Sequence, residues 1–431
     1  MFSQFLQNIF KALARHLIAR KKPRIIAVTG TVGKTSAKEA IASVLASTFT
    51  VRTAKKNYNN EWGVPFTILD IEGGNSFIDW IGTLGKAFWN SMFTQAYPEI
   101  LVLEFGIDKP GDMVQLCEIV QLDFAVITAL GGTPVHVENF SDKEALWKEK
   151  LAIAKGLKPD GVLLYNADDE ELARRGGAKA APRVLAFGVT PKADIWARDV
   201  RVLGDRNGLP VGISCTVVRG KETFALSMPR LIGAHQLTSV LASAAMGIAL
   251  KVHEKRIQKV LESFTPPRGR LKLLPGLKQS FILDDTYNAS PSSTQVALEV
   301  LGACSRKRRI AVMGDMLELG AYAEVAHRAI GRLATKSCDM LLAVGSRARF
   351  IADQARKEGF PDASIREFGL SPDAGKFLQR MMKMGDVVLV KGSQGMRMEK
   401  IVEEIMAEPQ RKEELLVRQD VAWRKKEVLP V

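Results

Sequence analysis

Cysteine is scarce in this chain of 431 residues, and its spacing argues against two common uses of it. The four cysteines are widely separated, and none forms a CxxC pair; they are Cys117, Cys215, Cys304 and Cys338. Neither a zinc site nor a disulfide framework is indicated, so a reducing cytoplasm is the expected location.

Long apolar runs are also missing. No stretch approaches the roughly 20 apolar residues that a membrane crossing requires. Hydrophobic residues make up 46% of the chain and charged residues 25%, as in soluble globular proteins. The length allows two or three domains, each with a large core.

Acidic residues are fewer than basic ones, 47 against 61, which gives a net charge of +14. Such an excess favours anionic partners, although a basic surface on a soluble protein accounts for it equally well. The chain contains no zinc-finger spacing, no RNP-like aromatic motif and no long Lys/Arg block. We therefore expect no nucleic-acid partner.

Residues 1–23, MFSQFLQNIFKALARHLIARKKP, predict a basic amphipathic helix. Lys11 and Arg15 interrupt the apolar stretch and no small-residue cleavage site follows, so a signal peptide is not indicated. Apolar side chains recur at helical spacing, at Phe2, Phe5, Leu6, Ile9, Phe10, Leu13, Leu17 and Ile18. Residues 1–22 could contact an anionic membrane surface, or pack on the protein's own body or on a partner.

From Arg24 onward, short apolar runs alternate with helical patterns, which is typical of βαβ units and a mostly parallel sheet. Predicted strands are 25–29, 100–104, 124–128 and 162–165, then 281–284, 310–313, 340–344 and 387–390. Helices are expected at 293–301 and 323–335, and a small antiparallel element at 193–227. Paired prolines within 264–270 exclude regular helix there and indicate a domain boundary.

The stretch GTVGKTS (residues 30–36) directly follows the first predicted strand and precedes a helical pattern. Gly30 and Gly33 let backbone N–H groups converge on phosphate oxygens, and the helix N-terminus adds positive potential. Lys34 would reach the terminal phosphates, and the Thr35 hydroxyl can ligate Mg²⁺. The strict GxxxxGK[ST] pattern is not met, because Val28 stands where its first glycine belongs. We predict a phosphate loop, with Thr31 and Ser36 also at the nucleotide.

Glu104 ends the predicted strand 100–104, where a parallel sheet places ligand groups. By position alone it is equally a surface residue at a strand end. Because Lys34 and Thr35 predict a bound triphosphate, we interpret Glu104 as a metal ligand.

These residues resemble the Mur ligases, ADP-forming amide ligases of bacterial cell-wall synthesis. The likeness rests on TGTVGKTS and on six further stretches in the family's order: KKNYNNEWGVPFTIL (55–69), VLEFGIDKPGDM (102–113), GRLKLL (269–274), DDTYNASPSS (284–293), AVMGDMLELG (311–320) and VKGSQGMRME (390–399). The last three are similar to the subgroup that adds D-alanyl-D-alanine to a UDP-MurNAc-tripeptide. The resemblance implies an α/β fold, with a P-loop central domain over 24–265 and a Rossmann-like C-terminal domain over 266–431.

For the central domain, the resemblance implies ATP and two Mg²⁺ ions as cofactors. His136 would ligate the second Mg²⁺, although a single histidine is weak support by itself. Lys150 matches the family lysine that CO₂ carbamylates, which converts a cation into an oxygen donor suited to Mg²⁺. That reaction needs a neutral amine, so the pKa of Lys150 should be lowered. Asn59 and Asn60 are expected at the substrate.

For the nucleotide and the amino substrate, the resemblance implies further contacts. Arg270 would reach the γ-phosphate, and an arginine fork suits that geometry. The other nucleotide contacts are expected at Asn166, His235, Gln236, Asp285, Tyr287 and Asn288. Lys391, Ser393 and Arg397 are expected to face the incoming amine.

The sequence departs from the family pattern at four places. Only 23 residues precede the first core strand, where the family has a domain that holds the uridine nucleotide. Three explanations are open: uridine is bound differently, another acceptor is used, or a partner protein supplies the domain. Ala129 replaces an asparagine, and two extra residues precede His136. Gln236 and Ser239 also replace asparagines, and Gln394 replaces an arginine.

Three functions remain in competition at this point. The first is the ligase that adds D-alanyl-D-alanine to a peptide-bearing cell-wall precursor, acting as a monomer. The second is a Mur-type ligase with another acceptor or amino donor, which the departures favour. The third is a P-loop NTPase without ligase activity, which would have no use for a carbamate at Lys150.

Overall fold

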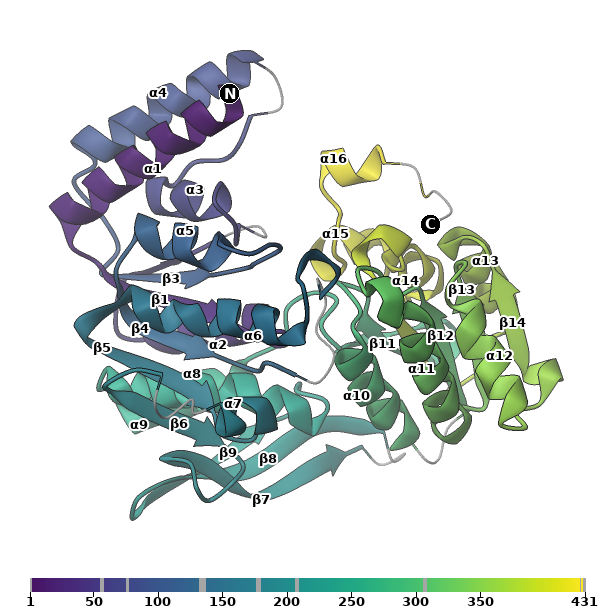
Figure 1. The fold of residues 1–431 in the computed structure, drawn as a ribbon. Helices are drawn as coiled ribbons and strands as arrows, with labels where there is room; N and C mark the ends of the chain where they lie inside the picture. The colour runs from purple at the N-terminus through teal and green to yellow at the C-terminus, as the bar shows by residue number, and fades with distance from the viewer. Residues whose placement is uncertain are drawn as a thin grey trace.

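The computed structural model describes residues 2–54, 58–74, 77–131, 137–175, 180–205, 209–304, 308–426 and 428. They form two α/β parts, each built on its own sheet, that face each other across the middle of the molecule (Figure 1). The α/β fold class expected from the alternating pattern is confirmed.

The first sheet has nine strands in the order β2-β3-β1-β4-β5-β6-β7-β8-β9. Their bounds are β1 (Arg24–Thr29), β2 (Val51–Thr53), β3 (Ile100–Glu104), β4 (Leu122–Ile127), β5 (Leu157–Asn166), β6 (Val184–Gly188), β7 (Ile195–Gly204), β8 (Pro210–Arg219) and β9 (Glu222–Met228). Neighbours from β2 to β7 run parallel, and β7, β8 and β9 pair antiparallel. The antiparallel element expected over 193–227 is therefore present, as an extension of the parallel sheet.

Helices cover both faces of this sheet because its central strands are apolar on both sides. Ile26 and Val28 of β1 share a core with α2 and α8, whereas Ile25 and Ala27 point to the opposite core, which includes α1 and α3. The helices of this part are α1 (Phe2–Lys21), α2 (Lys34–Ala46), α3 (Gly63–Leu69), α4 (Phe77–Phe93), α5 (Asp112–Ile119), α6 (Lys143–Leu151), α7 (Glu170–Arg174), α8 (Leu237–Ala249) and α9 (Glu254–Ser263).

Helix α1 packs on the protein's own body, one of the three alternatives that its sequence allowed. Phe10, Ala14 and Leu17 are each at most 1% exposed. The ring of Phe10 lies 5.2 Å from that of Phe66 and 6.1 Å from that of Trp80, measured between ring centres. The apolar stripe of α1 is thus an integral part of a core.

We expect Phe10→Ala to lower the free energy of unfolding by roughly 3–5 kcal/mol, because it removes a buried ring and leaves a cavity. Phe5→Ala is the matched control on the same helix. Phe5 is 62% exposed, so its loss should change stability by no more than about 0.5 kcal/mol. Urea titration followed by circular dichroism measures both, and equal effects would contradict this packing.

The second sheet has six strands in the order β10-β11-β15-β12-β13-β14. Their bounds are β10 (Lys272–Pro275), β11 (Phe281–Asp285), β12 (Arg309–Gly314), β13 (Met340–Val344), β14 (Ile365–Phe368) and β15 (Val387–Lys391). All pairs are parallel except β10–β11. This sheet, covered on both faces, has the Rossmann-like architecture that was expected.

Its helices are α10 (Pro291–Gly302), α11 (Ala323–Ser337), α12 (Arg349–Lys357), α13 (Ser371–Met381), α14 (Glu399–Ile405), α15 (Lys412–Leu415) and α16 (Val421–Arg424). Residues of α10, α11 and α12 share one core with the sheet, and residues of α13 and α14 share the other. Residues 264–270, between α9 and β10, hold neither helix nor strand. Across the described part of the chain, every helix is too short or too polar to pass through a bilayer.

Candidate active site

The phosphate loop (residues 30–36) links the end of β1 to the start of α2. Gly30 has a φ of 148° and Gly33 a φ of 84°, values that side chains disfavour. A Cβ on Gly30 would lie 2.2 Å from the hydroxyl of Thr128. Nζ of Lys34 donates to the carbonyl of Gly30 at 2.7 Å, so the lysine folds back over the loop.

The segment after β4 supports this loop. The Thr128 hydroxyl donates to the carbonyl of Val32 at 2.6 Å, and the amide of Thr31 donates to the carbonyl of Ala129 at 2.7 Å. Ala129 contributes its backbone carbonyl to this bond, so the bond does not depend on the side chain at position 129. The sequence did not predict a role for Thr128, although its place at the end of the strand beside β1 was a usable signal.

Two lysines converge on the same carbonyl. Nζ of Lys150, on α6, donates to Gly30 O at 3.4 Å, and Lys150 is 4% exposed. Burial, reinforced by the positive charge of Lys34, lowers the pKa of Lys150 far below its usual value. Burial also lowers the pKa of Lys34, while Glu104 opposes that shift. The arrangement favours a neutral amine at Lys150, as carbamylation would require.

Carboxylates stand near this lysine pair. Glu104, at the end of β3, is 4% exposed and accepts a hydrogen bond from Nδ2 of Asn59 at 3.3 Å. Asp108, in the loop that follows, lies close enough to raise the pKa of both Lys34 and Lys150. Sequence reasoning missed Asp108, although FGIDKPGDM directly follows the strand that ends in Glu104.

The described residues contain no group of three His, Cys, Asp or Glu side chains arranged to hold a metal ion. His136 lies outside the described residues. The donors that fit Mg²⁺ are oxygens: the Thr35 hydroxyl and the buried carboxylate of Glu104. The two-metal arrangement therefore stays a prediction.

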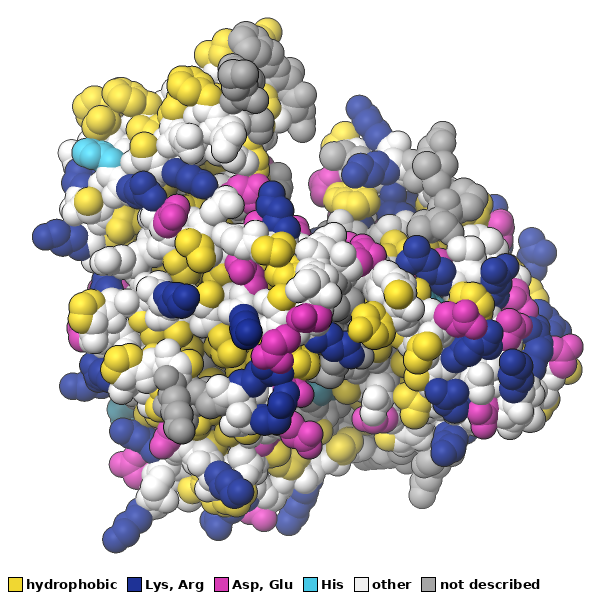
Figure 2. All heavy atoms as spheres, viewed as in Figure 1, with side chains coloured by type: hydrophobic (Ala, Val, Ile, Leu, Met, Phe, Trp, Pro, Cys, Tyr) yellow, Lys and Arg dark blue, Asp and Glu magenta, His cyan; other side chains and the backbone are white. Residues whose placement is uncertain are grey.

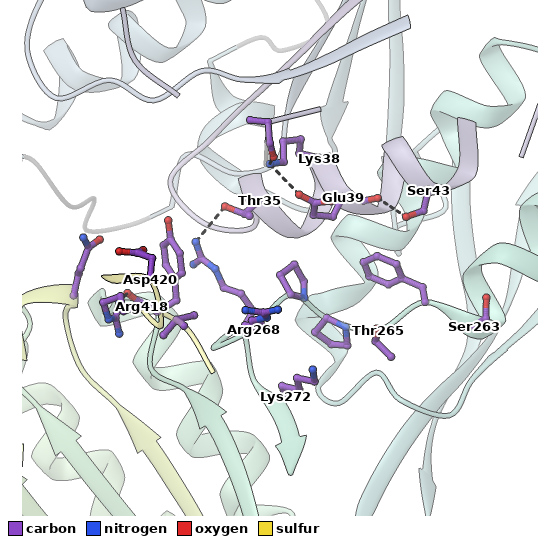
Figure 3. Close-up of a pocket in the computed structure, with 18 of the residues that line it drawn as sticks. Thr35, Lys38, Glu39, Ser43, Ser263, Thr265, Arg268, Lys272, Arg418 and Asp420 are labelled. Atoms are coloured by element: carbon purple, nitrogen blue, oxygen red, sulfur yellow. Dashed lines mark hydrogen bonds and ion pairs between the residues drawn. The ribbon is translucent and has the colours of Figure 1, made fainter. Parts of the chain in front are cut away.

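Arg270 joins the second α/β part to the phosphate loop. Its Nη2 donates to the Thr35 hydroxyl at 3.2 Å, the bond that ends at Thr35 in Figure 3. Its guanidinium carbon lies 3.8 Å from the centre of the Tyr287 ring. Nε of Arg270 is buried and has no hydrogen-bond partner among the described residues. The stacked guanidinium thus presents unused donor capacity beside the phosphate loop.

Asp285 and Lys391 form a buried ion pair behind Arg270. Nζ of Lys391 lies 2.6 Å from Oδ2 of Asp285 and donates to the carbonyl of Asn288 at 3.0 Å. The amide of Leu271 donates to the other carboxylate oxygen at 3.1 Å. Lys391 is 2% exposed. Its contacts fix the orientation of Asp285.

Two cavities lie between the α/β parts. The smaller, about 220 Å³, is lined by Val32, Gly33, Ser36, Thr128, Ala129, Gly131, His235, Gln236, Thr238, Ser239, Arg270, Asp285, Ser292, Ser293, Val296 and Lys391. Loss of hydration lowers the pKa of His235, which keeps its ring neutral near pH 7. The larger, about 840 Å³, includes Thr35, Lys38, Glu39, Arg268, Arg270, Lys272, Tyr287, Gln394, Arg418, Asp420 and Trp423 in its lining (Figure 3). Arg270 lines both cavities, so it stands at their junction.

Models of two Mur ligase domains match this chain. The Mur ligase middle domain matches residues 28–80 and 81–247, and the Mur ligase glutamate ligase domain matches residues 269–394. The chain belongs to the Mur ligase family. Residues 248–268 fall between the two matches, and the boundary of this Mur ligase near residue 265 stays a prediction.

Relatives of this Mur ligase carry a common name. The UDP-N-acetylmuramoyl-tripeptide–D-alanyl-D-alanine ligase of Bacillus subtilis is 28% identical, over 94% of this chain and 79% of its own. The enzyme of that name from Escherichia coli is 27% identical, over 91% of this chain and 79% of its own. A crystal structure of MurF from Acinetobacter baumannii matches with a TM-score of 0.75 and 25% identity, covering 93% of this chain and 79% of that one.

A second solved structure shows the same fold. MurF from Thermotoga maritima, in complex with ADP, matches the Mur ligase described here with a TM-score of 0.75 and 24% identity. The match covers 94% of this chain and 84% of that one.

Some predicted contacts of this Mur ligase lie away from both cavities or are engaged within the protein. Oδ1 of Asn166 accepts from the amide of Asp168 at 3.1 Å, and Asn166 lines neither cavity. Oδ1 of Asn60 accepts from the amide of Gly63 at 3.0 Å, at the start of α3. Their roles in binding stay predictions.

Of the three residues expected at the amino substrate, one lines a cavity and the other two line neither cavity. Lys391 lines the smaller cavity. The Ser393 hydroxyl accepts from the amide of Leu317 at 2.9 Å. Arg397 is 3% exposed, and its Nε donates to Oε1 of Glu399 at 2.6 Å. Neither Ser393 nor Arg397 lines the larger cavity, whereas Gln394 does.

Proposed function

We propose that this Mur ligase is an ATP-dependent amide ligase that adds D-alanyl-D-alanine to a UDP-MurNAc-tripeptide in the cytoplasm, releasing ADP and phosphate. The relatives' printed names support the substrates. The observation that carries the proposal is the hydrogen bond from Arg270 to Thr35, because it joins two distant parts of the chain at the phosphate loop.

ATP would lie across the junction of the two cavities. Its phosphates would rest on the amides of the phosphate loop and on Lys34. Its nucleoside would occupy the smaller cavity, beside His235, Gln236 and Asp285. The γ-phosphate would then meet Arg270, and the peptide acid would approach from the larger cavity.

The reaction follows from this placement. A carboxylate oxygen of the acceptor attacks the γ-phosphorus, the bond from that phosphorus to the bridging oxygen breaks, and ADP leaves. The amine of the dipeptide then attacks the acyl carbon of the acyl phosphate, and phosphate departs. Lys34 and Arg270 stabilise the charge that develops on the phosphoryl oxygens. Closure of the two parts would exclude water from the acyl phosphate.

Thr35, Glu104, His136 and a carbamylated Lys150 would hold Mg²⁺. When bound, the metal would supply charge neutralisation for the triphosphate. The buried carboxylate of Glu104 and the lowered pKa of Lys150 fit this role.

A phosphate-release assay tests the proposal. We expect turnover only when UDP-MurNAc-tripeptide, D-Ala-D-Ala and ATP are all present. D-Ala alone and the tripeptide without its uridine nucleotide are the comparison substrates. Equal turnover without any acceptor would contradict a ligase and favour a plain NTPase.

One observation favours a second candidate, a Mur-type ligase with another acceptor or amino donor. Gln394 lines the larger cavity, where the family resemblance leads us to expect an arginine. A neutral amide in that position contributes no charge towards an anionic substrate. Turnover with a different acceptor or donor in the same assay would establish this alternative.

We expect Arg270→Lys to lower kcat about 100-fold while leaving the fold intact. Lysine keeps the charge but loses the planar fork and the stacking on Tyr287, which lies 3.8 Å from the guanidinium. Arg268→Lys is the matched control, because Arg268 lines the larger cavity alone. Steady-state kinetics measure both variants, and an equal fall in kcat for the two would contradict a distinct catalytic role for Arg270.

The monomeric state remains a prediction, and so does a peripheral membrane contact through residues 1–22. Since Phe10, Ala14 and Leu17 are buried, such a contact would need side chains other than the apolar stripe of α1.

A further inference from the structure

Helix α4 exposes an unusually apolar face. Six large side chains lie on it, which we call the α4 stripe: Ile78, Ile81, Phe88, Trp89, Met92 and Phe93. Ile78 is 78% exposed and Trp89 63%. Figure 2 shows hydrophobic side chains gathered over the end of the molecule where α1 and α4 lie. Apolar patches of this kind mark interaction sites.

No polar side chain interrupts the stripe, because the residues between its members on this face are glycines. At 100° per residue, Gly82 and Gly85 fall on the same face as the six large side chains. A Cβ on either glycine would meet no atom within 4 Å. The two charged residues of α4, Asp79 and Lys86, lie at the edge of the face. No charged group therefore interrupts the stripe along its length.

The inner face of α4 is firmly attached to the body. Ala87 and Ser91 are fully buried, and the Ser91 hydroxyl donates to the carbonyl of Leu13 on α1 at 3.0 Å. The outward direction of the stripe is thus set by packing against α1.

Basic side chains surround one end of the stripe. Residues 2–22 contain five Lys and Arg and no acidic residue. Arg20 donates to the carbonyls of Met92 and Thr94, and Lys21 donates to that of Gln95. Among the described residues, no carboxylate forms an ion pair with Arg20, Lys21, Lys22 or Lys86. Their charges remain available to an anionic partner.

We propose that the α4 stripe docks this enzyme on an anionic lipid surface, with the adjoining basic residues of α1 at the headgroups. Aromatic and aliphatic side chains beside Lys and Arg are the composition of helices that lie in a membrane interface. Such helices bury their apolar face about 5–10 Å deep, a depth that side chains projecting from one helix can reach.

A second copy of the chain fits this surface less well. One face of a 17-residue helix, about 25 Å long and 10 Å wide, covers roughly 250 Å². A stable protein interface needs about 800 Å² from each partner. Arg20, Lys21, Lys22 and Lys86, four cations without an ion-pair partner among the described residues, would also repel their copies across a two-fold axis.

Co-sedimentation of the full chain with vesicles tests the proposal. We expect binding to phosphatidylcholine vesicles that contain phosphatidylglycerol, and weaker binding to phosphatidylcholine alone. The variant Trp89→Glu/Phe93→Glu should lower the partition coefficient at least about tenfold, because it removes two apolar anchors. Both residues are more than half exposed, so the fold should persist, which circular dichroism checks.

Two further variants provide a matched control and a test of the electrostatic contribution to binding. Val325→Glu on α11 is the matched control, since Val325 is 67% exposed on the other α/β part; its binding should equal that of the wild type. Lys22→Gln/Lys86→Gln should weaken binding to anionic vesicles and reduce its sensitivity to salt. Equal binding by the wild type and the Trp89/Phe93 variant would overturn the proposal. So would a dimer in sedimentation velocity that this variant abolishes, without vesicle binding by the wild type.

Discussion

Replacing Lys34 with alanine is expected to lower ADP formation by about 100- to 1000-fold or more, because one preorganised donor at a developing negative charge is worth that much. Lys34 is the first residue of α2, and its Nζ reaches back to the carbonyl of Gly30. Burial lowers its pKa, while Glu104 raises it. A triphosphate on the loop adds negative charge, which favours the ammonium form during turnover.

The test compares three measurements on Lys34→Ala. Phosphate release should nearly vanish, binding of an ATP analogue should weaken, and the thermal unfolding midpoint should change little. Lys259→Ala, a substitution of an exposed lysine on α9, should leave all three unchanged. Turnover by Lys34→Ala at the wild-type rate would rule out this site as the place of phosphoryl transfer.

The core of the fold could be predicted because its signals are local. Apolar runs such as those of β3 and β13 were located to the residue, and the glycine loop between β1 and α2 was recognised from adjacent residues. The strands that the sequence did not reveal are short: β2, β10 and β14 at sheet edges, and β6 within the nine-stranded sheet. Few residues and few buried side chains leave little periodicity to detect.

The site was harder to predict, since its decisive contacts join distant residues. Thr35 and Arg270 are 235 positions apart, and no spacing rule predicts that bond. The family resemblance indicated a role for each residue but not their contact. Likewise, no local pattern predicted that Lys391 pairs with Asp285 at the smaller cavity, and its role at the amino substrate stays a prediction. Side-chain partners of this kind depend on how two sheets are placed, which local patterns do not encode.

Helix α4 shows a different limit of prediction from sequence. The sequence drew attention to the basic residues 1–22, and the structure shows that their apolar side is buried against the segment that includes Phe66 and Trp80. The exposed apolar face belongs to α4 instead. An amphipathic pattern indicates that a face will be covered, but not whether protein or another surface covers it.

Lys150→Ala is expected to lower turnover about 100-fold and to abolish its dependence on bicarbonate. A carbamate forms when the neutral amine attacks CO₂, so the fraction of reactive amine rises as the pH rises through the lowered pKa of Lys150. Wild-type activity should therefore fall in CO₂-free buffer, and should fall further as the pH is lowered. A carbamate carbon in a ¹³C spectrum, present in the wild type and absent in the variant, would identify the group.

Lys148→Ala provides the control on the same helix, because Lys148 is exposed and should not respond to bicarbonate. Lys150→Met, measured in CO₂-free buffer where no carbamate forms, shows how the buried amine itself affects the stability of the fold. A folded-state pKa below the unfolded value of about 10.4 means that the unfolded chain binds more protons, so the wild type gains stability as the pH rises between those values. The stability advantage of Lys150→Met should accordingly be largest at low pH and shrink towards pH 10. Full, bicarbonate-independent turnover by Lys150→Ala would instead indicate an NTPase that makes no use of a carbamate.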